Sequence, residues 1–293
     1  MSQSVSQNIT SIKLRALYDI TKFRLSATVV FSGAFGFILA SDTIDWLKLV
    51  LFCIAAFSTT AAANVINQII EKDLDIHMKR TQDRPLPSGR LSVKEAALFG
   101  WGLAAIAMYI LFYEFNSRAG LLALLSMVLY GFVYTPLKRV GPVAVAVGAL
   151  PGAFPPMIGW IAASNHFGLE PGILFAIQFF WQFPHFWAIA WVLNDDYNKA
   201  GFKLLPSKGG QNQSSAIQIM IYTVFLLPLC WIPHYMGMTG INSAIVATIC
   251  GTLFLAQTFY LIRKVDRRAA LQLMFGSFIY LPVVQIAYLL DKL

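Results

Sequence analysis

The sequence predicts an all-α polytopic membrane protein with nine transmembrane helices. Of its 293 residues, 57% are hydrophobic and only 12% are charged, and the mean hydropathy is +0.64. This composition is too apolar for a soluble domain. Apolar runs of roughly 20 residues recur along the chain, and a helix of that length can cross about 30 Å of hydrocarbon.

Nine such runs follow one another, and each supports one predicted helix. In order along the chain, they cover approximately residues 25–41, 47–70, 93–113, 119–135, 142–163, 171–193, 215–237, 241–262 and 270–290. No linker between them marks a second domain, so we expect a single transmembrane domain at residues 25–293. The polar start of the chain lacks the apolar core of a signal peptide and the Arg-rich character of a transit peptide. We therefore expect residues 1–24 to form a short cytoplasmic segment.

The positive charges are divided unevenly between the two sides of the predicted membrane. If the N-terminus is placed on one side, 19 of the 22 lysines and arginines fall on that side, and only Lys48, Arg118 and Lys292 fall on the other. Segments rich in Lys and Arg stay in the cytoplasm, so we expect a membrane protein with a cytoplasmic N-terminus and an external C-terminus. The net charge of +8 then reflects topology. No basic soluble domain is present to bind nucleic acid, and we expect no such partner.

Two of the predicted inner segments are long and rich in both acids and bases. The first is NQIIEKDLDIHMKRTQDRPLPSG at 67–89, after the second predicted helix, and the other is NDDYNKAGFKLLPSKGGQNQSS at 194–215, after the sixth. An ion-coupled transporter usually carries its ionisable residues near the membrane midplane, on broken helices. The acids here lie at helix ends on one side, so we expect a chemical site at the cytoplasmic mouth rather than a transport path.

The acids of the first segment have helical spacing. Asn67, Glu71 and Asp75 are spaced i, i+4, i+8, so on a continuing helix they form one row, each about 40° round from the last. Asp73 points roughly the opposite way. Like charges at this spacing repel each other, so the row indicates a bound cation, and Mg²⁺ prefers a few carboxylates together with waters and phosphates. An ordinary cytoplasmic loop would explain the bases of this segment but not its acids.

The bases that follow the row suit phosphate. Arg80 and Arg84 come directly after the acids, and a guanidinium group recognises phosphate oxygens with two parallel hydrogen bonds. The segment therefore predicts metal ligands followed by phosphate ligands.

The second segment repeats this combination of acids and bases. Asp195 and Asp196 are followed by Lys199 and Lys203, and Lys138 lies on the same side, between the fourth and fifth predicted helices. Two acidic clusters with nearby bases fit a diphosphate bridged to two Mg²⁺ ions. The metals would neutralise the diphosphate as it leaves, which lowers the barrier to breaking its C–O bond.

These segments resemble a known family, the UbiA-type intramembrane prenyltransferases. Residues 67–89 are similar to its N-x-x-x-D-x-x-x-D segment and the R-T-x-x-R-P sequence that follows. Three blocks resemble more specifically the heme branch, the protoheme IX farnesyltransferases: GAFPPMIGW at 152–160, WQFPHFWAIAW at 181–191 and DDYNKAGFKLLP at 195–206. The resemblance extends from about Thr21 to the last helix.

The resemblance implies a UbiA-type bundle of nine helices in the bacterial inner membrane, with its active site at the cytoplasmic face. It implies transfer of farnesyl from farnesyl diphosphate to a vinyl group of heme B, with water supplying a hydroxyl, to give heme O for terminal oxidases. Mg²⁺ bound through the two acidic motifs would hold the diphosphate. Heme A synthase or the terminal oxidase machinery would then be partners, alongside the lipid bilayer. The alternative within the superfamily is prenylation of an aromatic quinone precursor, which should lack the FPHFWA block that is present here.

Two positions depart from the pattern of the family. Glu71 stands where the family usually has Asp, and its extra methylene can shift the metal geometry. The second motif reads Asp195-Asp196-x-x-Lys199 rather than D-x-x-x-D. Either aspartate could therefore bind the second metal, and we favour Asp196 over Asp195.

A heme substrate would also give a role to His185, in the sixth predicted helix. A lone histidine inside a membrane is more often a hydrogen-bonded core residue than a ligand, but heme iron binds imidazole. We expect His185 to contact heme. Aromatic side chains surround it in the sequence and are candidates for the pocket wall: Trp181, Phe183, Phe186 and Trp187.

Overall fold

The structure is a computed structural model that describes residues 2–207 and 210–293, with side chains described from Ser11 onward. Lys208, one of the inner-side bases counted above, lies outside the described residues. Within this part of the chain the secondary structure is helical, and nine helices are long and apolar enough to cross a membrane. The predicted all-α fold with nine transmembrane helices is therefore confirmed.

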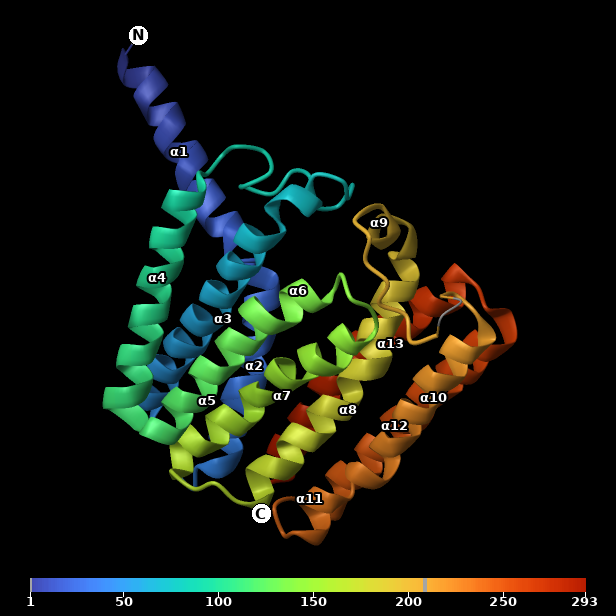
Figure 1. The fold of residues 1–293 in the computed structure, drawn as a ribbon. Helices are drawn as coiled ribbons and strands as arrows, with labels where there is room; N and C mark the ends of the chain where they lie inside the picture. Colours follow the sequence, from blue (N-terminus) through green and yellow to red (C-terminus); the bar gives the residue numbers. More distant parts are fainter. Residues whose placement is uncertain (1, 208–209) are drawn as a thin grey trace.

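The helices follow each other along the chain as in Figure 1. The nine spans and two additional helices have these bounds: α1 (Ser2–Ile20), α2 (Phe23–Ala40), α3 (Trp46–Asp75), α4 with the π-helical turn η1 (Val93–Tyr109, Ile110–Phe115), α5 with η2 and α6 (Ser117–Val128, Leu129–Tyr134, Thr135–Leu137), α7 (Val143–Ser164), α8 (Leu169–Val192), α9 (Asn194–Lys199), α10 with α11 (Gln213–Leu229, Ile232–Tyr235), α12 (Ile241–Lys264) and α13 (Arg267–Leu290). Helices α1 and α9 are the two that lie outside these spans.

One helix is longer than hydropathy predicts. The apolar run after Trp46 stops near residue 70, whereas α3 continues to Asp75. Hydropathy marks only the apolar part of a helix, and beyond it Glu71 and Asp75 are buried and paired with bases from other segments. The next span begins at a capping box, in which the Ser92 hydroxyl accepts from the Glu95 N–H and the Glu95 carboxylate accepts from the Ser92 N–H. This pair fixes the start of α4.

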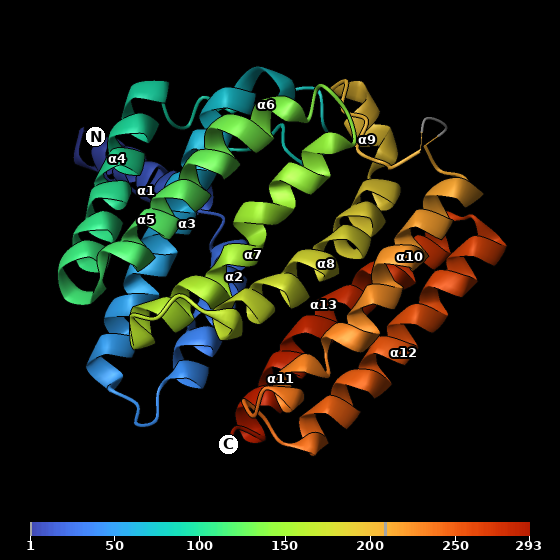
Figure 2. The same ribbon diagram turned by 60° about the horizontal axis from the view of Figure 1, so that its bottom comes forward.

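The bundle centres on α7, which is the most buried of the nine spans. Its closest neighbour is α2, and Figure 2 shows α2 passing directly behind it. A Cβ added to Gly36 would lie 1.9 Å from the Pro156 carbonyl oxygen, and one added to Gly159 would lie 1.9 Å from the Gly33 carbonyl oxygen. Only glycine allows two helix backbones to approach this closely, which is how small residues drive helix association in lipid.

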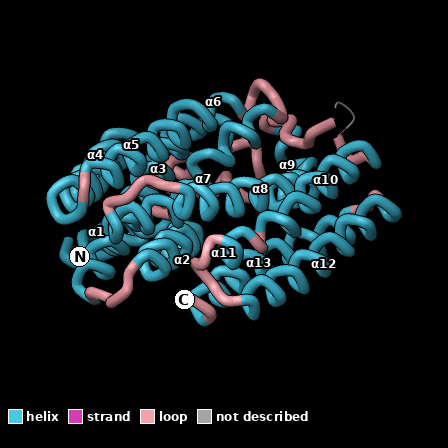
Figure 3. The backbone as a smooth tube through the Cα atoms, turned by 90° about the horizontal axis from the view of Figure 1, so that it is seen from below, coloured by secondary structure: helices cyan, strands magenta, loops and turns pink. Residues whose placement is uncertain are grey.

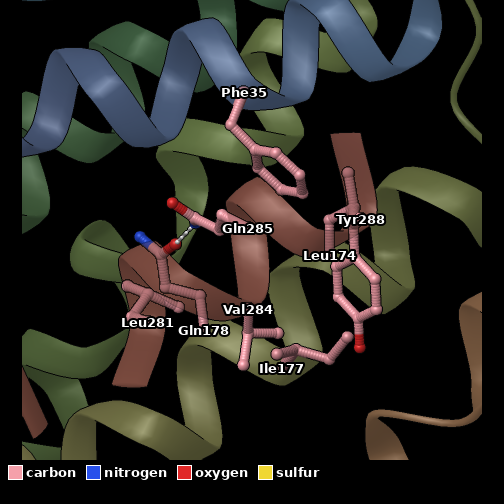
Figure 4. Close-up of a pocket in the computed structure, with 8 residues that line it drawn as sticks. All are labelled: Phe35, Leu174, Ile177, Gln178, Leu281, Val284, Gln285 and Tyr288. Carbon is pink, nitrogen blue, oxygen red and sulfur yellow. Dashed lines mark hydrogen bonds between the residues drawn. The ribbon is translucent and has the colours of Figure 1, made fainter. Parts of the chain in front are cut away.

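A neutral cluster of Ser32, Gln178 and Gln285 joins three helices inside the bundle. The Ser32 hydroxyl donates to Gln178 Oε1 at 2.6 Å, and Gln285 Nε2 donates to Ser32 Oγ at 2.7 Å and to Gln178 Oε1 at 3.1 Å. Figure 4 shows Gln178 and Gln285 side by side, next to a small cavity lined otherwise by Phe35, Tyr288 and aliphatic side chains. These hydrogen bonds connect α2, α8 and α13, which are far apart in the chain.

The charged segments gather at one end of the bundle. Figure 1 shows α1, the segment after α3, α6 and α9 at the same end, while the C-terminus lies at the opposite end. Seen from that opposite end in Figure 3, the connections between helices are short. Two acidic segments that are more than 100 residues apart in the chain therefore meet over one mouth of the bundle.

Candidate active site

The last two turns of α3 carry the predicted row of oxygen ligands. Asn67, Glu71 and Asp75 are 1%, 3% and 0% exposed, whereas the Asp73 side chain is 78% exposed. Helical spacing thus directs the row into the protein and Asp73 out of it, as predicted. Three polar side chains buried together require partners, and each has one from another segment of the chain.

Asn67 is held between α2 and α6. Lys22 Nζ donates to its Oδ1 at 3.0 Å, and its Nδ2 donates to Thr135 Oγ1 at 3.1 Å. Lys22 is the residue that precedes α2, and its φ of +50° places it in the left-handed region, which costs a non-glycine residue of order 1–3 kcal/mol. This strained turn holds the ammonium over the row. The sequence identified Lys22 only as one of many inner-side bases.

Glu71 forms a buried ion pair with Lys138, which follows α6. The distance from Lys138 Nζ to Glu71 Oε1 is 2.7 Å, and the lysine side chain is only 12% exposed. The ammonium also lies 4.7 Å from the centre of the Tyr134 ring and 5.9 Å from that of Phe202. The structure therefore brings Lys138 to the row through packing between α3 and the end of the fourth span.

Asp75 is paired with Arg84 across the returning loop. Arg84 Nη1 donates to both carboxylate oxygens, at 2.9 Å and 2.7 Å. The Thr81 hydroxyl donates to the Asp75 carbonyl oxygen at 2.8 Å, which turns the chain back over the end of α3. The loop thereby carries its arginine to the acid.

The second acidic segment docks on this loop through α9. The Asp196 carboxylate accepts from Lys199 Nζ at 3.3 Å and lies close to the backbone N–H groups of Lys79 and Arg80. Partial desolvation raises the pKa of this carboxyl, but the lysine and the two N–H groups outweigh it and hold the pKa below its usual value. Arg80 in turn donates to the Tyr197 hydroxyl at 3.2 Å and lies over the Tyr197 ring.

Not every predicted ligand turns toward this mouth. Asp195 and Lys203 are exposed to solvent, whereas Asp196 is partly buried against the loop. His185 lies on α8, ten residues before Asp195 in the chain. There it packs against α13 rather than near the acids. Among its predicted aromatic neighbours, Trp181 and Phe186 contact it.

The other two aromatic residues face a different helix. Phe183 and Trp187 pack on Tyr222 of α10, with ring centres 4.2 Å and 5.1 Å apart. Residues two positions away from His185 point to another side of the helix, because each residue turns the helix by about 100°. Their predicted place beside His185 is therefore wrong.

The mouth holds more positive than negative charge. Burial of the Lys22 ammonium, together with the nearby charges of Arg84 and Lys138, lowers its pKa well below the ordinary value. Three basic side chains, those of Lys22, Lys138 and Arg84, surround two buried carboxylates, those of Glu71 and Asp75. This excess suits an anionic ligand with several oxygens, such as a diphosphate.

The oxygen-bearing side chains of the row fit Mg²⁺, which also binds waters and phosphate oxygens. They fit less well a metal that protein side chains alone surround. No three His, Cys, Asp or Glu side chains converge on one metal position within residues 2–207 and 210–293. Mg²⁺ does not need such a cage, because it binds through one or two carboxylates plus waters and phosphate oxygens. Two further buried oxygens on α3, Asn64 Oδ1 and Gln68 Oε1, have no hydrogen-bond partner in the structure. The donor set around the row is therefore rich in oxygen and fits Mg²⁺.

Known proteins resemble this chain over most of its length. The model of the UbiA prenyltransferase family matches residues 29–281. A protoheme IX farnesyltransferase from Cytophaga hutchinsonii is 55% identical over 282 residues, which cover 96% of this chain and 99% of the relative. Another from Christiangramia forsetii is 43% identical, with coverage of 100% and 98%.

Solved structures share the fold at lower identity. A digeranylgeranylglyceryl phosphate synthase superimposes with a TM-score of 0.80 at 22% identity, covering 95% of this chain and 98% of that one. A UbiA homologue from Archaeoglobus fulgidus bound to GPP and Mg²⁺ superimposes with a TM-score of 0.65 at 16% identity, covering 93% and 99%. This multi-pass membrane protein belongs to the UbiA prenyltransferase family and, within it, to the protoheme IX farnesyltransferases.

Proposed function

We propose that this protein transfers the farnesyl group of farnesyl diphosphate to a vinyl group of heme B, with water supplying a hydroxyl, to give heme O for terminal oxidases. The names of its full-length relatives support the reaction. The observation that carries it is the buried row of Asn67, Glu71 and Asp75, faced by Lys22, Lys138 and Arg84 at one mouth of the bundle. An acid row with surplus cations is what a metal-bound diphosphate requires.

The residues of the mouth divide into two groups in this proposal. Oxygen ligands for Mg²⁺ come from Asn67, Glu71, Asp75 and Asp196, with the exposed Asp195 as the other acid of the second motif. Cations for the diphosphate come from Lys22, Arg80, Arg84, Lys138, Lys199 and Lys203. When bound, Mg²⁺ would neutralise the carboxylates and polarise the diphosphate oxygens.

The charge of the leaving group determines the chemistry that the chain must perform. As the C1–O bond of farnesyl diphosphate breaks, negative charge grows on the departing oxygen, and the ammonium and guanidinium groups of the mouth stabilise it. The allylic cation that remains must be kept from water. The ring centres of Tyr130 and Tyr134 lie 5.4 Å apart, and Lys138 lies over the Tyr134 ring. These two aromatic rings can stabilise the allylic cation. The π electrons of the vinyl group then form the new C–C bond, and water adds to the resulting cation with loss of a proton.

The remaining assignments belong to the same proposal. His185 contacts heme, residues 1–24 form a cytoplasmic segment and residues 25–293 form the prenyltransferase domain. The charged end of the bundle faces the cytoplasm of the bacterial cell and the C-terminus lies outside, because inner segments hold most of the lysines and arginines. Heme A synthase or the terminal oxidase machinery takes up the product.

The test is a pair of matched substitutions on α3. Membranes that contain the protein are incubated with heme B, farnesyl diphosphate and Mg²⁺, and farnesylated heme is measured by mass. We expect Asp75→Asn to lower the rate about 10²–10³-fold, because it removes a charged ligand from the reacting diphosphate. Asp73→Asn, two residues away and exposed, should leave the rate unchanged.

Two results would contradict this proposal. Normal heme O formation by Asp75→Asn would remove the acid row from catalysis. Prenylation of an aromatic quinone precursor instead of heme by the unsubstituted protein would show that the acceptor is wrong. Omission of Mg²⁺ with added chelator should abolish the reaction, and an unchanged rate would exclude the metal.

A further inference from the structure

A chain of two hydrogen bonds that starts at His185 determines which of its ring nitrogens carries the proton. Its Nδ1 lies 2.8 Å from Ser277 Oγ on α13. The same Oγ lies 2.6 Å from the carbonyl oxygen of Met274, one turn earlier on that helix. The three groups therefore form a chain that leads from the imidazole through a hydroxyl to a backbone carbonyl.

The direction of this chain follows from the chemistry of its last member. A carbonyl oxygen only accepts hydrogen bonds, and a serine hydroxyl has a single hydrogen to give. The Ser277 hydrogen is used on Met274, so Ser277 must accept from His185. Nδ1 therefore carries the proton, and Nε2 keeps a free lone pair. Among the described residues, no hydrogen bond is made to Nε2.

Neighbouring rings prevent the imidazole from turning over. The Trp181 indole stacks on it, with ring centres 4.4 Å apart and an angle of 19° between the planes. The indole is itself fixed, because Trp181 Nε1 donates to the Ser277 carbonyl oxygen at 3.0 Å. Phe278 covers an edge of the imidazole at 5.1 Å and is 46% exposed on the bundle surface. His185 is only partly buried and lies beside this exposed ring, on the side of α8 that faces α13.

We propose that His185 binds the iron of the heme substrate through Nε2, and that Ser277 is the positioning residue that holds this tautomer and orientation. The identity of the metal compound rests on the proposed function. A neutral imidazole that donates from one nitrogen to a fixed acceptor and presents the other is the usual form of a metal-binding histidine. The iron of heme takes such a ligand.

This position separates the iron from the bond that forms. α8 continues from His185 to its end at Val192, a rise of about 10 Å along the helix, before Asp195 follows on α9. The imidazole would thus anchor the centre of the porphyrin within the membrane, below the diphosphate mouth. Ser277 touches neither reacting atom and acts only through His185.

Heme binding without turnover tests the assignment. The purified full-length protein in detergent is titrated with ferric heme in the absence of farnesyl diphosphate and Mg²⁺, and the absorption spectrum is recorded. We expect Ser277→Ala to weaken heme affinity about 10–100-fold, as for other groups that orient a metal ligand. We expect His185→Ala to lose the imidazole-bound spectrum and to regain it when free imidazole is added. In steady-state kinetics, Ser277→Ala should raise the KM for heme and not that for farnesyl diphosphate.

Ser243→Ala is the matched control for the serine substitution. Ser243 is also buried, and its hydroxyl also donates to a carbonyl three residues earlier, that of Gly240, without contacting a histidine. It should bind heme as the unsubstituted protein does. Equal affinity and an equal spectrum for Ser277→Ala would overturn the positioning role, and an unchanged spectrum for His185→Ala would overturn the iron ligand.

A measurement on the unsubstituted protein covers the case in which Ser277→Ala fails to fold. The chain has 4 histidines, so ¹⁵N labelling of histidine gives few signals, and His185→Ala identifies the one of interest. We expect that ring to be protonated at Nδ1 and bare at Nε2 before heme is added, and the opposite tautomer would refute the proposal. Neither readout depends on farnesyl transfer, so a protein that fails to farnesylate heme would refute the proposed function alone.

Discussion

The acid-and-base mouth and the neutral cluster of Ser32, Gln178 and Gln285 both join distant helices through buried polar groups. They do so with different chemistry. The mouth pairs Glu71 with Lys138 at 2.7 Å, so it buries full charges. The neutral cluster makes hydrogen bonds of 2.6–3.1 Å between uncharged side chains. Each buried charge costs several kcal/mol of desolvation, whereas a buried amide costs much less.

The neutral cluster and the charged mouth therefore have different roles in the same bundle. The neutral cluster shows that amides and hydroxyls are sufficient to connect α2, α8 and α13. Charges are therefore not needed to hold helices together here, and in the proposed function those of the mouth bind the metal and the diphosphate. Substitutions in the two regions should separate activity from stability, and the following predictions are ordered by the size of the expected effect.

The largest effect is expected at Lys138. Replacement by Met removes a cation from the diphosphate site, and we expect kcat for heme O formation to fall about 10²–10³-fold. It also leaves Glu71 buried without its partner, which should lower the free energy of unfolding by about 3–5 kcal/mol. Mass-based product assays and thermal unfolding in detergent measure the two effects.

A double variant distinguishes the two roles of this pair. Lys138→Met combined with Glu71→Leu replaces both charges with apolar groups, which often restores stability. We expect a stable and inactive protein. An active double variant would show that the pair serves packing alone, as the neutral cluster does.

A smaller effect is expected at Lys22, and it should depend on pH. Because the pKa of its ammonium is lowered, Lys22 loses its charge at a lower pH than an ordinary lysine does. The KM for farnesyl diphosphate should therefore rise about tenfold as pH increases through that pKa, since one charge-assisted hydrogen bond is lost. The free energy of unfolding should rise over the same pH range. The unfolded chain holds this proton more tightly than the folded one, so loss of the proton favours folding.

Lys22→Arg provides the comparison, because a guanidinium stays charged over the whole range. The pH profile of the KM should then be flat. Lys13→Arg is the control, since Lys13 pairs with Glu95 on the surface and should leave the profile of the unsubstituted protein in place. A profile that is the same in Lys22→Arg as in the unsubstituted protein would exclude Lys22 as its origin.

The smallest effect on activity is expected in the neutral cluster. Gln285→Leu removes two interhelical hydrogen bonds, and such bonds contribute roughly 0.6–1.7 kcal/mol each within membranes. We expect a lower unfolding temperature and a kcat within about twofold of the original. A large loss of kcat at unchanged stability would mean that this region also takes part in the reaction.

The local sequence was sufficient for most of the fold and for part of the site. Apolar runs of membrane-spanning length predict nine helices, and nine are found among the described residues. The i, i+4, i+8 spacing of Asn67, Glu71 and Asp75 predicts a single row, and that row is buried while Asp73 is exposed. These features depend on helical periodicity and on the thickness of a membrane, which a single segment of sequence carries by itself.

The partners of those residues were decided only by the tertiary structure. Lys22 reaches Asn67 across 45 positions of the chain, Lys138 reaches Glu71 across 67, and Ser277 reaches His185 across 92. No periodicity links residues at such separations. They meet because two kinds of contact fix which helices are neighbours and how far each one is rotated. These are the close approach of α2 and α7 at their glycines and the hydrogen bonds of the neutral cluster. The sequence alone therefore determines which side chains face inward, while helix packing determines which of them come into contact.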